Sequence, residues 1–507
     1  MRILLSKEEM KACDRITIEK FGMPSVVLME RAALVCVEEL HKSGADLRKI
    51  LVVCGSGNNG GDGFAIARLL FLEGFDVDIY FAGRENYCTP ETSAQKRICE
   101  KYGITFCGNL QMNEYTVIVD ALFGVGLSRN ITGDYAELIA GINESPAFVL
   151  AVDIPSGIDG DTGAVRGIAV CADLTVTFAF EQPGHYIGKG RDYTGKTVLR
   201  QIGITKESFC GQKPVFHCYD QTDFKRLPRR LNTENKGSCG KVLLIAGSRD
   251  MCGAAILAAK AAYRTGAGLV RVYTDLCNKP VIQQSLPEAV VNCISDVWTE
   301  QLQDLLNWAD AAAIGPGIGM DSPKREILSY VLEHGKIPVI LDADALNLTA
   351  AYDLPLLRYQ SELMVTPHLG EMARLCKKTI PEISENLPLY AENFARENHV
   401  VCVLKDAGTV VSDGKDIYIN TSGNSGMATG GSGDVLTGIL SGLAAQEMSL
   451  FDAGRIGVYL HGCAGDAAAK KLGKCSMLAG DIAEGISEIL KNKCAFGTER
   501  TGEKHEQ

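Results

Sequence analysis

Residues 424–442 read NSGMATGGSGDVLTGILSG, and this stretch decides the fold expected for the second half of the chain. Small residues fill positions 428–433, Asp434 follows them, and apolar residues then recur at helical spacing from Val435 to Leu440. The pattern predicts a glycine-rich loop that leads directly into a helix with one apolar face. Glycines let the first N–H groups of such a helix point together at a phosphate, and the helix dipole adds to the attraction.

Asp434 is the acidic residue of this stretch. A carboxylate would repel a phosphate bound beside it, so it is a poor phosphate ligand. It is a good base for a hydroxyl group that is about to attack that phosphate. An Asp beside a glycine-rich turn is also a common helix cap, and the stretch alone leaves both interpretations open.

Length and composition indicate two large α/β domains and exclude several classes of protein. The chain has 507 residues, with 46% hydrophobic and 22% charged residues, 54 glycines and a formal net charge of -11. This charge, without a long Lys/Arg block, argues against a nucleic-acid partner and leaves any phosphate to backbone amides. The 18 cysteines form no CxxC pair, which is typical of free thiols in a reducing cytoplasm. With no signal pattern and no apolar run of membrane-spanning length, we expect a cytoplasmic protein without a membrane partner.

A strand, a glycine loop and a helix are predicted near the start of the first half. Ile50–Cys54 forms a short apolar run, residues 55–63 read GSGNNGGDG, and the helix is expected from about Phe64. The loop contains a GxGxxG pattern, which suggests the pyrophosphate of a dinucleotide at the helix N-terminus. Two Asn and one Asp are more than such a turn needs, so we expect it to hold more than a phosphate.

Two further predicted strands end in an acid. Residues 117–120 end in Asp120 and residues 148–153 end in Asp153. Because the carboxyl ends of parallel strands meet at one edge of a sheet, Asn59, Asp120, Asp153 and Ser156 are expected to converge there. Their oxygens suit a hard cation, and the carboxylates could also move a proton. The alternative is that each Asp caps the turn that follows it.

The order GNNGGDG, VDALFGVGL, AVDIPSGIDGDTG resembles the NAD(P)H-hydrate epimerase family over residues 1 to about 215. The resemblance implies an epimerase domain at 1–215 with a Rossmann-like three-layer sandwich. It implies potassium (K+) ligands at Asn59, Asp120 and Ser156, and an acid/base at Asp120 or Asp153. The implied substrate contacts are Asn58, Asn59, Gly60, Gly61, Asp62, Gly124, Val125, Gly126, Leu127, Ser128, Arg129, Asn130 and Asp153.

The substrates implied by this resemblance are the hydrated forms of NADH and NADPH, called NADHX and NADPHX. Their C6 hydroxyl stands beside the ring nitrogen. Loss of hydroxide, assisted by the nitrogen lone pair, gives a planar iminium to which water returns on either face. A positioned carboxylate would help in both directions.

A second β/α series begins near Asn235. A strand is expected at Lys241–Ala246, a helix entered through Gly253, and a strand within GAGLVRVYT. Apolar segments that end in polar or glycine clusters continue at AAAIGPGIG, PVILDADALN, LMVTPHLGE and VVCVLKDAGTVV. This alternation predicts an α/β layered sandwich around a largely parallel sheet.

The ends of these strands again collect polar residues. Asp342 and Asp344 flank a turn, and His368 precedes Gly370 and Glu371 at a helix start. A lone histidine is often structural, but its place at a strand end upstream of GGSGD favours function. Lys405 is either the charge partner of a nucleotide phosphate or a solvated turn residue.

Together GPG, DADALN, TPHxGE, KDAGT and GGSGDVLTG resemble the ADP/ATP-dependent NAD(P)H-hydrate dehydratase family of the ribokinase-like superfamily. The resemblance implies a ribokinase-like three-layer α/β dehydratase domain at 225–492, followed by a polar tail at 493–507. It implies Asp434 as the base that activates the hydrate, with Mg2+ and either ADP or ATP as cosubstrate. The implied hydrate contacts are Ala254, Gly317, His368 and Asp434, and the implied nucleotide contacts are Lys405, Asp406, Ala407, Gly408, Thr409 and Gly433. Asp406 stands where relatives often carry glycine.

The two resemblances together predict a bifunctional metabolite repair enzyme, an isomerase and a lyase in one chain. A dehydratase that accepts one epimer needs an epimerase to supply it. The alternative is a small-molecule kinase, of a vitamin or sugar alcohol, with a non-catalytic N-terminal module, because GGSGD is shared across the superfamily. We also expect a homo-oligomer.

Overall fold

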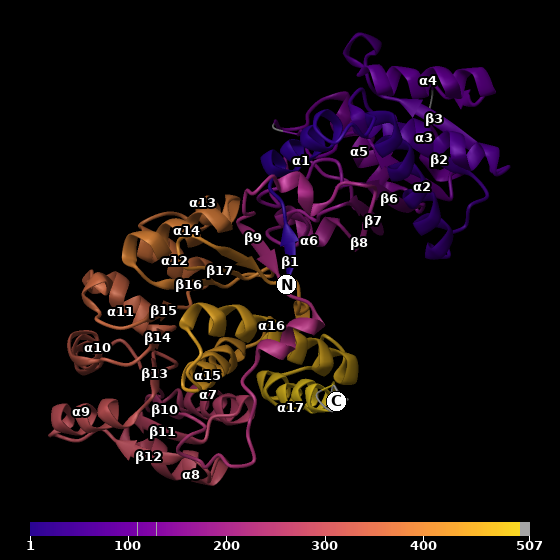
Figure 1. The fold of residues 1–507 in the computed structure, drawn as a ribbon. Helices are drawn as coiled ribbons and strands as arrows, with labels where there is room; N and C mark the ends of the chain where they lie inside the picture. The colour runs from indigo at the N-terminus through magenta and orange to yellow at the C-terminus, as the bar shows by residue number, and fades with distance from the viewer. Residues whose placement is uncertain (109, 128, 497–507) are drawn as a thin grey trace, which may run out of the picture. The chain divides into compact units, whose positions relative to one another are not determined.

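The computed structural model describes residues 1–108, 110–127 and 129–496, and it divides into two compact units. The first unit is Ile3–Phe216. The second comprises the described residues from His217 onward, together with Met1 and Arg2 (Figure 1). Each unit is built around its own sheet and carries its own hydrophobic core.

The sheet of the first unit has the strand order β4-β3-β2-β5-β6-β7-β8, and all its pairings are parallel. The central strands are continuous apolar runs because both faces of a parallel sheet are covered. The strands are β2 (Ile50–Cys54), β3 (Val77–Phe81), β4 (Thr105–Phe106), β5 (Val117–Ala121), β6 (Phe148–Val152), β7 (Leu174–Phe178) and β8 (Lys196–Arg200).

Helices cover both faces of this sheet. One core cluster joins the strands to α1 (Lys7–Glu19), α2 (Ser25–Ser43), α3 (Asn58–Leu72) and α4 (Pro90–Tyr102). A second cluster on the other face includes α5 (Asp134–Glu144), and the short α6 (Gly190–Tyr193) precedes β8. The predicted three-layer α/β sandwich is therefore confirmed for this unit.

The first unit has a topological switch point between β2 and β5. From β2 the chain moves outward through β3 and β4, and it then returns to place β5 on the other side of β2. The connections that follow these two strands diverge to opposite faces, to α3 and to α5. In open α/β sheets this crevice is where ligands bind.

The prediction that a helix begins near Phe64 is wrong, because α3 begins at Asn58. The glycines lie in the first helical turns, where they allow close packing. A Cβ atom on Gly60 would collide with the carbonyl oxygen of Gly55, and one on Gly63 would lie 2.6 Å from the Cβ of Ala121. The sequence pattern suggested a loop because glycine disfavours helix interiors, but tertiary contact overrides that preference here.

The sheet of the second unit has the order β1-β9-β18-β17-β16-β15-β14-β13-β10-β11-β12. Its strands are parallel from β12 to β16, while β17 pairs antiparallel with β16 and β18. The predicted largely parallel sheet is confirmed. The strands are β1 (Arg2–Leu4), β9 (Phe216–Cys218), β10 (Lys241–Ile245), β11 (Leu269–Thr274), β12 (Val290–Cys293), β13 (Ala311–Ile314), β14 (Val339–Leu341), β15 (Leu363–Val365), β16 (Val401–Leu404), β17 (Val410–Ser412) and β18 (Ile417–Ile419).

Helices also cover both faces of the second sheet. One face packs against α7 (Cys252–Thr265), α8 (Lys279–Ser285), α15 (Ser432–Ala444), α16 (Leu450–Leu472) and α17 (Ala479–Phe496). On the other, α9 (Trp298–Trp308) contacts β10 and α14 (Leu387–Asn398) contacts β16 and β17. Pairwise contacts link α9 and α14 through α10 (Ser322–His334), α11 (Asp344–Tyr352), α12 (Leu369–Cys376) and α13 (Ile380–Glu385).

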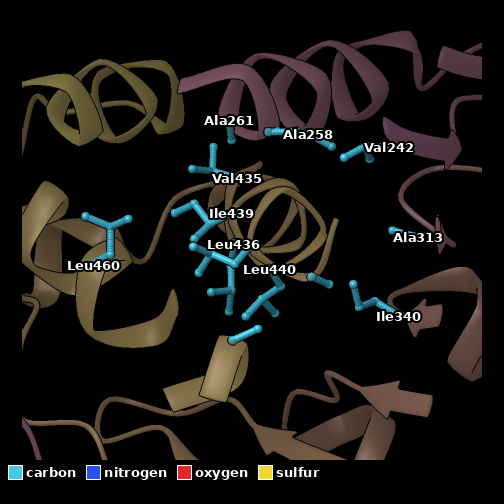
Figure 2. Packing of buried hydrophobic residues seen from close by; sticks show 14 of the residues in the cluster. Val242, Ala258, Ala261, Ala313, Ile340, Val435, Leu436, Ile439, Leu440 and Leu460 are labelled. Carbon is cyan, nitrogen blue, oxygen red and sulfur yellow. The ribbon is translucent and has the colours of Figure 1, made fainter. Parts of the chain in front are cut away.

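The apolar face of α15 lies at the centre of the second core, as Figure 2 shows. Val435 and Ile439 lie near Ala258 and Ala261 of α7, and the strand residues Val242, Ala313 and Ile340 belong to the same cluster. The small residues of α7 allow the two helices to approach closely. The predicted helix after the glycine loop is therefore buried, and its first turn is fixed by this packing.

Helix α17 continues through Phe496, so residues 493–496 of the predicted polar tail are helical. The rest of that tail lies outside the described residues. Among the described helices, none combines the length and the apolar composition needed to cross a membrane.

Candidate active sites

A cavity of approximately 950 Å³ opens in the first unit where β2, β5 and β6 end. Its walls come from the connections on both sides of the switch point, and also from α1, α2 and the chain after β3. The predicted substrate residues that line it are Asn58, Asn59, Asp62, Gly124, Val125, Gly126, Leu127, Arg129 and Asp153. Gly60 and Gly61 are buried inside α3, Asn130 does not line the cavity, and Ser128 lies outside the described residues.

The N-terminus of α3 offers an anion-binding surface to this cavity. The backbone N–H groups of Asn58, Asn59 and Gly60 donate to no described residue. Gly57, Asn58 and Asn59 line the cavity wall. Free N–H groups at the positive end of a helix bind phosphate well, so this wall suits the pyrophosphate of a dinucleotide.

Three carboxyl groups face the same cavity, from Asp14 on α1, Asp62 on α3 and Asp153 after β6. Burial raises the pKa of Asp14 to about 7, and the neighbouring Asp153 adds to the shift. Burial, together with Asp153 and Asp14, raises the pKa of Asp62 well above its usual value. A carboxyl group that titrates near neutral pH can both give and take a proton.

Asp14 is a site residue that the sequence pattern does not predict. Its only local signal is a polar residue within an amphipathic helix, which is ordinary on a solvent-facing side. Asp14 reaches the cavity because α1 packs beside the sheet edge, and that placement depends on tertiary contacts.

Asp153 occupies a strained turn at the end of β6. Its φ is +67°, and the amide of Ile154 donates to the carbonyl of Val152 at 2.9 Å, which closes a γ-turn around it. Thr177 donates to its carboxylate at 3.1 Å, and His185 Nε2 lies 3.0 Å from its carbonyl oxygen. Burial raises the pKa of Asp153, although His185 and Thr177 oppose the shift. Strain held by surrounding contacts is typical of functional positions.

Asp120 and Ser156 are both buried and lie together below the cavity wall. The Ser156 hydroxyl donates to Asp120 at 2.6 Å and its amide donates at 2.8 Å. Burial raises the pKa of Asp120 to about 6 against these hydrogen bonds. No cationic side chain among the causes that shift the pKa of Asp120 lies beside it, so a bound cation would compensate its charge.

Asn59, the third predicted cation ligand, lies against Gly124, since a Cβ on Gly124 would be 3.3 Å from its side chain. Its buried Nδ2 has no hydrogen-bond partner among the described residues. The connection that carries Gly124 also carries Phe123, whose amide donates to Ser156 at 2.9 Å. Asn59, Asp120 and Ser156 therefore border one short segment, and their oxygens fit a hard cation.

In the second unit, Asp434 lies in the first turn of α15 and is half-buried. Its carboxylate neither accepts a hydrogen bond nor forms an ion pair with a described residue. Burial raises the pKa of Asp434 to about 7; Asp342 and Asp344 add to the shift, and Lys405 opposes it. The alternative that Asp434 caps the helix is wrong, since the N-cap position is Gly431. A carboxyl group with no partner that loses its proton near pH 7 is suited to act as a base.

The amides around Asp434 are arranged as expected for the anion site that the glycine loop predicts. The N–H groups of Gly430, Gly433 and Asp434 donate to no described residue. Gly431 has φ +93°, a conformation that glycine adopts freely, and it turns the loop into the helix. A phosphoryl group bound by these amides would lie beside the Asp434 carboxylate.

Ala254 and Gly317, two of the predicted hydrate contacts, lie side by side. They follow β10 and β13, which flank the switch point of the second sheet. Gly317 has φ +58°, and a Cβ on it would lie 3.2 Å from the Cβ of Ala254. A residue larger than glycine at position 317 would contact the start of α7.

His368 pairs with Lys405 through a parallel bridge between the strand ends. Its Nδ1 accepts from the amides of Gly370 and Glu371, so Nε2 carries the proton and lies 3.2 Å from Glu371 Oε1. His368 therefore caps α12, which is a structural role. Its side chain is still 55% exposed, so it remains accessible to a ligand.

Residues 405–409 form the turn between β16 and β17, with Gly408 buried and Ala407 exposed. The Thr409 hydroxyl donates to the carbonyl of Asp406 at 3.2 Å, within the turn itself. Lys405 is not a solvated turn residue. Its side chain is 19% exposed, and its ammonium lies 2.7 Å from Asp342, pointing beneath the Gly433 loop.

Among the described residues, no group of three or more His, Cys, Asp or Glu is arranged to hold a metal ion. Mg2+ in nucleotide sites is held by one or two carboxylates and by the phosphates themselves, so the site fits a magnesium nucleotide.

Comparison with known proteins gives two family matches. Residues 242–488 match a family described as NAD(P)H-hydrate dehydratase, and residues 25–184 match one described as YjeF-related protein N-terminus. The bifunctional NAD(P)H-hydrate repair enzyme Nnr of Moorella thermoacetica is 36% identical over 518 residues, which cover 96% of this chain and 97% of the relative.

Two solved structures resemble the second unit. A ribokinase-like superfamily protein from Enterococcus faecalis V583 is 30% identical, with a TM-score of 0.51, over 55% of this chain and 97% of that one. The Bacillus subtilis ADP/ATP-dependent NAD(P)H-hydrate dehydratase, co-crystallised with ATP and Mg2+, is 31% identical with a TM-score of 0.49, over 54% and 98%. The match to the Enterococcus faecalis structure confirms the ribokinase-like fold of the second unit.

The relative from Moorella thermoacetica matches almost from end to end, and the two family matches fall on separate units. This chain therefore belongs to the family of bifunctional NAD(P)H-hydrate repair enzymes.

Proposed function

We propose that the first unit interconverts the R and S forms of NADHX and NADPHX, and that the second dehydrates the S form to NADH or NADPH. The second reaction consumes ADP or ATP and releases AMP or ADP together with phosphate. The observation that carries the proposal is Asp434, a carboxyl group without a partner that titrates near neutral pH beside free helix amides. The products of the repair are the intact dinucleotides.

In the proposed dehydration, Asp434 takes the proton of the C6 hydroxyl, whose oxygen then attacks the terminal phosphoryl group of the nucleotide. The amides of Gly433 and Asp434 stabilise the negative charge on the transferring group. Mg2+, when bound with the nucleotide, would neutralise charge on its phosphates. Phosphate then leaves as the ring nitrogen supplies electrons, and loss of the C5 proton restores the double bond.

The same proposal assigns contacts to the hydrate and to the nucleotide. Gly317, Ala254 and His368 would contact the hydrate. Residues 405–409 and Gly433 would hold the nucleotide, with Lys405 contributing charge through its position under the loop. Asp406 adds a negative charge to this turn, and we propose that it weakens nucleotide affinity relative to glycine.

In the proposed epimerisation, Asp153 is the acid/base rather than Asp120. Asp153 lines the cavity, whereas Asp120 is buried beside Ser156 and does not. A protonated carboxyl group assists the departure of the C6 hydroxyl, and the carboxylate then takes a proton from the water that returns. Asp14 and Asp62 face the same space and can exchange the proton with Asp153. Potassium held by Asn59, Asp120 and Ser156 would compensate the buried carboxylate.

The products decide between this function and a kinase. With NADHX, Mg2+ and either ADP or ATP, we expect one free phosphate for each dihydronicotinamide formed. Phosphorus NMR measures the phosphate, and absorbance measures the dihydronicotinamide. A stable phosphorylated product would instead support a small-molecule kinase with a non-catalytic first unit. In the Asp434→Asn variant, dehydration should stop while chromatography still shows the two epimers exchanging, faster in K+ than in Na+.

We also propose that the protein works in the cytoplasm as a homo-oligomer, which size-exclusion chromatography with light scattering would test.

A further inference from the structure

A buried carboxylate, Asp342, lies at the end of β14 and accepts hydrogen bonds from three other elements. Its Oδ1 receives the Lys405 ammonium and the Thr366 hydroxyl, each at 2.7 Å, and its Oδ2 receives the Thr437 hydroxyl at 2.7 Å. Burial alone would raise the pKa of Asp342, but Lys405 and the two hydroxyls lower it. The group is therefore ionised, and it joins the ends of β14, β15 and β16 to α15.

The bond to Thr437 fixes the orientation of α15. Thr437 follows Asp434 by three residues, so the two side chains lie on adjoining positions of one helix face. Thr437 is fully buried, and its hydroxyl has Asp342 as its partner. A hydrogen bond to an ionised, buried acceptor is stronger than one between neutral groups, so it resists rotation of the helix.

The bond to Lys405 places a positive charge beneath the glycine loop. The Lys405 Nζ lies 3.5 Å from the position that a Cβ on Gly433 would take. Burial alone would lower the pKa of Lys405, but Asp342, Glu371 and Asp434 raise it, so the ammonium keeps its proton. The ammonium therefore stands close to the amides that would receive the phosphoryl group.

We propose that Asp342 is a positioning residue of the dehydratase site, which holds the Lys405 ammonium and, through Thr437, the Asp434 carboxylate in fixed register about the transferring phosphoryl group. The inference rests on the proposed function of this site. It assigns to Asp342 no contact with the substrate or the nucleotide.

Several charged groups face Asp434 from the surrounding elements. They are Asp342 after β14, Asp344 at the start of α11, and Lys405 after β16. Glu371 acts on Lys405, and His461 of α16 lies 3.4 Å from the Ser432 hydroxyl, with its pKa lowered to about 4 by burial. His461 is therefore neutral where Asp434 titrates. Loss of the Asp342 charge should lower the pKa of Asp434, and loss of the Lys405 charge should raise it.

The test compares Asp342→Asn, Lys405→Gln, Thr437→Val and Thr437→Ser in the full chain. In Asp342→Asn we expect kcat to fall by roughly 10- to 100-fold, because Lys405 and Asp434 are displaced. The acid limb of the pH profile, where kcat rises as Asp434 loses its proton, should move to lower pH. In Lys405→Gln the acid limb should move to higher pH. Thr437→Val should lower kcat without moving the limb, and Thr437→Ser, which keeps the hydroxyl, should restore it.

A readout that does not need turnover separates this inference from the proposed function. Carbon-13 NMR of labelled aspartate carboxyl groups, with Asp434 assigned from Asp434→Asn, should show the same opposite pKa shifts without substrate. Ser441→Ala, which removes another buried hydroxyl of α15, is the matched control. It should leave kcat and the pKa of Asp434 unchanged. An Asp342→Asn variant with unchanged kcat and an unmoved Asp434 pKa would overturn the inference. If the wild type does not dehydrate NADHX but the shifts occur, the proposed function fails and the positioning stands.

Discussion

The environment of Asp434 makes ionisation of its carboxyl group costly, which suits the proposed role of this group as a base. Burial and the neighbouring Asp342 raise its pKa to about 7, whereas an Asp in the unfolded chain titrates near its ordinary value of about 3.9. The folded protein therefore binds a proton that the unfolded chain has released. This difference makes the ionised carboxyl group a source of instability whose size depends on pH.

The first prediction concerns this instability. Asp434→Asn should raise the melting temperature of the second unit, because the amide carries no ionisation penalty. The penalty grows from about pH 4, where the unfolded Asp titrates, to about pH 7, and stays constant above. The gain should therefore increase over this interval and reach a few degrees at pH 8.

Tryptophan fluorescence measures the melting temperature of the second unit directly, because both tryptophans of the chain, Trp298 and Trp308, lie in this unit. Equal melting temperatures for the wild type and Asp434→Asn at pH 8 would show that ionisation of Asp434 does not destabilise the folded protein.

At this scale the sequence predicted the local position of a residue better than its side-chain partners. The spacing around GGSGD predicted that Asp434 lies at the start of a helix, because a local loop and helix determine its position. The sequence leaves two roles open for Lys405, because its pairing with Asp342 joins residues 63 positions apart. Asp14 was missed for the same reason, because α1 meets the cavity only in the folded unit.

At the scale of elements, the position of α15, which carries Asp434, depends on close packing against α7. A Cβ on Gly438 would collide with the carbonyl oxygen of Ala258, and it would lie 2.7 Å from the Cβ of Ala261. Backbone atoms of a packed helix cannot move aside at low cost. Gly438 thus sets how near α15 lies to α7, and so where Asp434 is placed.

Gly438→Ala should therefore destabilise the second unit by about 1–3 kcal/mol, as overpacking does in cores, and should lower kcat for dehydration. Tryptophan fluorescence during urea unfolding measures the stability change. Gly480→Ala is the control: a Cβ there meets nothing within 4 Å on α17, so stability should be unchanged or slightly raised. Equal stability of the two variants would contradict the packing account.

The boundaries of elements were predictable where the pattern is local. The strand at Ile50–Cys54 is observed with the predicted bounds, because a continuous apolar run suits a strand that is buried on both faces. The predicted start of α3 lies six residues after the observed one, at Asn58. The glycines of this helix contact Gly55 and Ala121, and no local pattern reveals these contacts.

At the scale of the whole molecule, each of the two units carries its own candidate site. Each has its own sheet, switch point and core, and each offers free helix amides with a carboxyl group of raised pKa beside them. The layered fold of both units followed from the alternation of apolar and glycine-rich segments. That the two activities belong together did not follow from pattern or spacing; it came from the resemblance and the matched relatives.

The most direct test supplies the purified protein with both epimers of NADHX, Mg2+, K+ and either ADP or ATP, and follows the return of dihydronicotinamide absorbance. The wild type should recover all of the substrate faster than spontaneous epimer exchange allows. Asp153→Asn should recover the S share and then slow to the spontaneous rate, and Asp434→Asn should recover none. Mixing these two variants should restore full recovery, because each supplies the site that the other lacks. Full, fast recovery by Asp153→Asn, or no recovery by the wild type with either nucleotide, would contradict the two-site account.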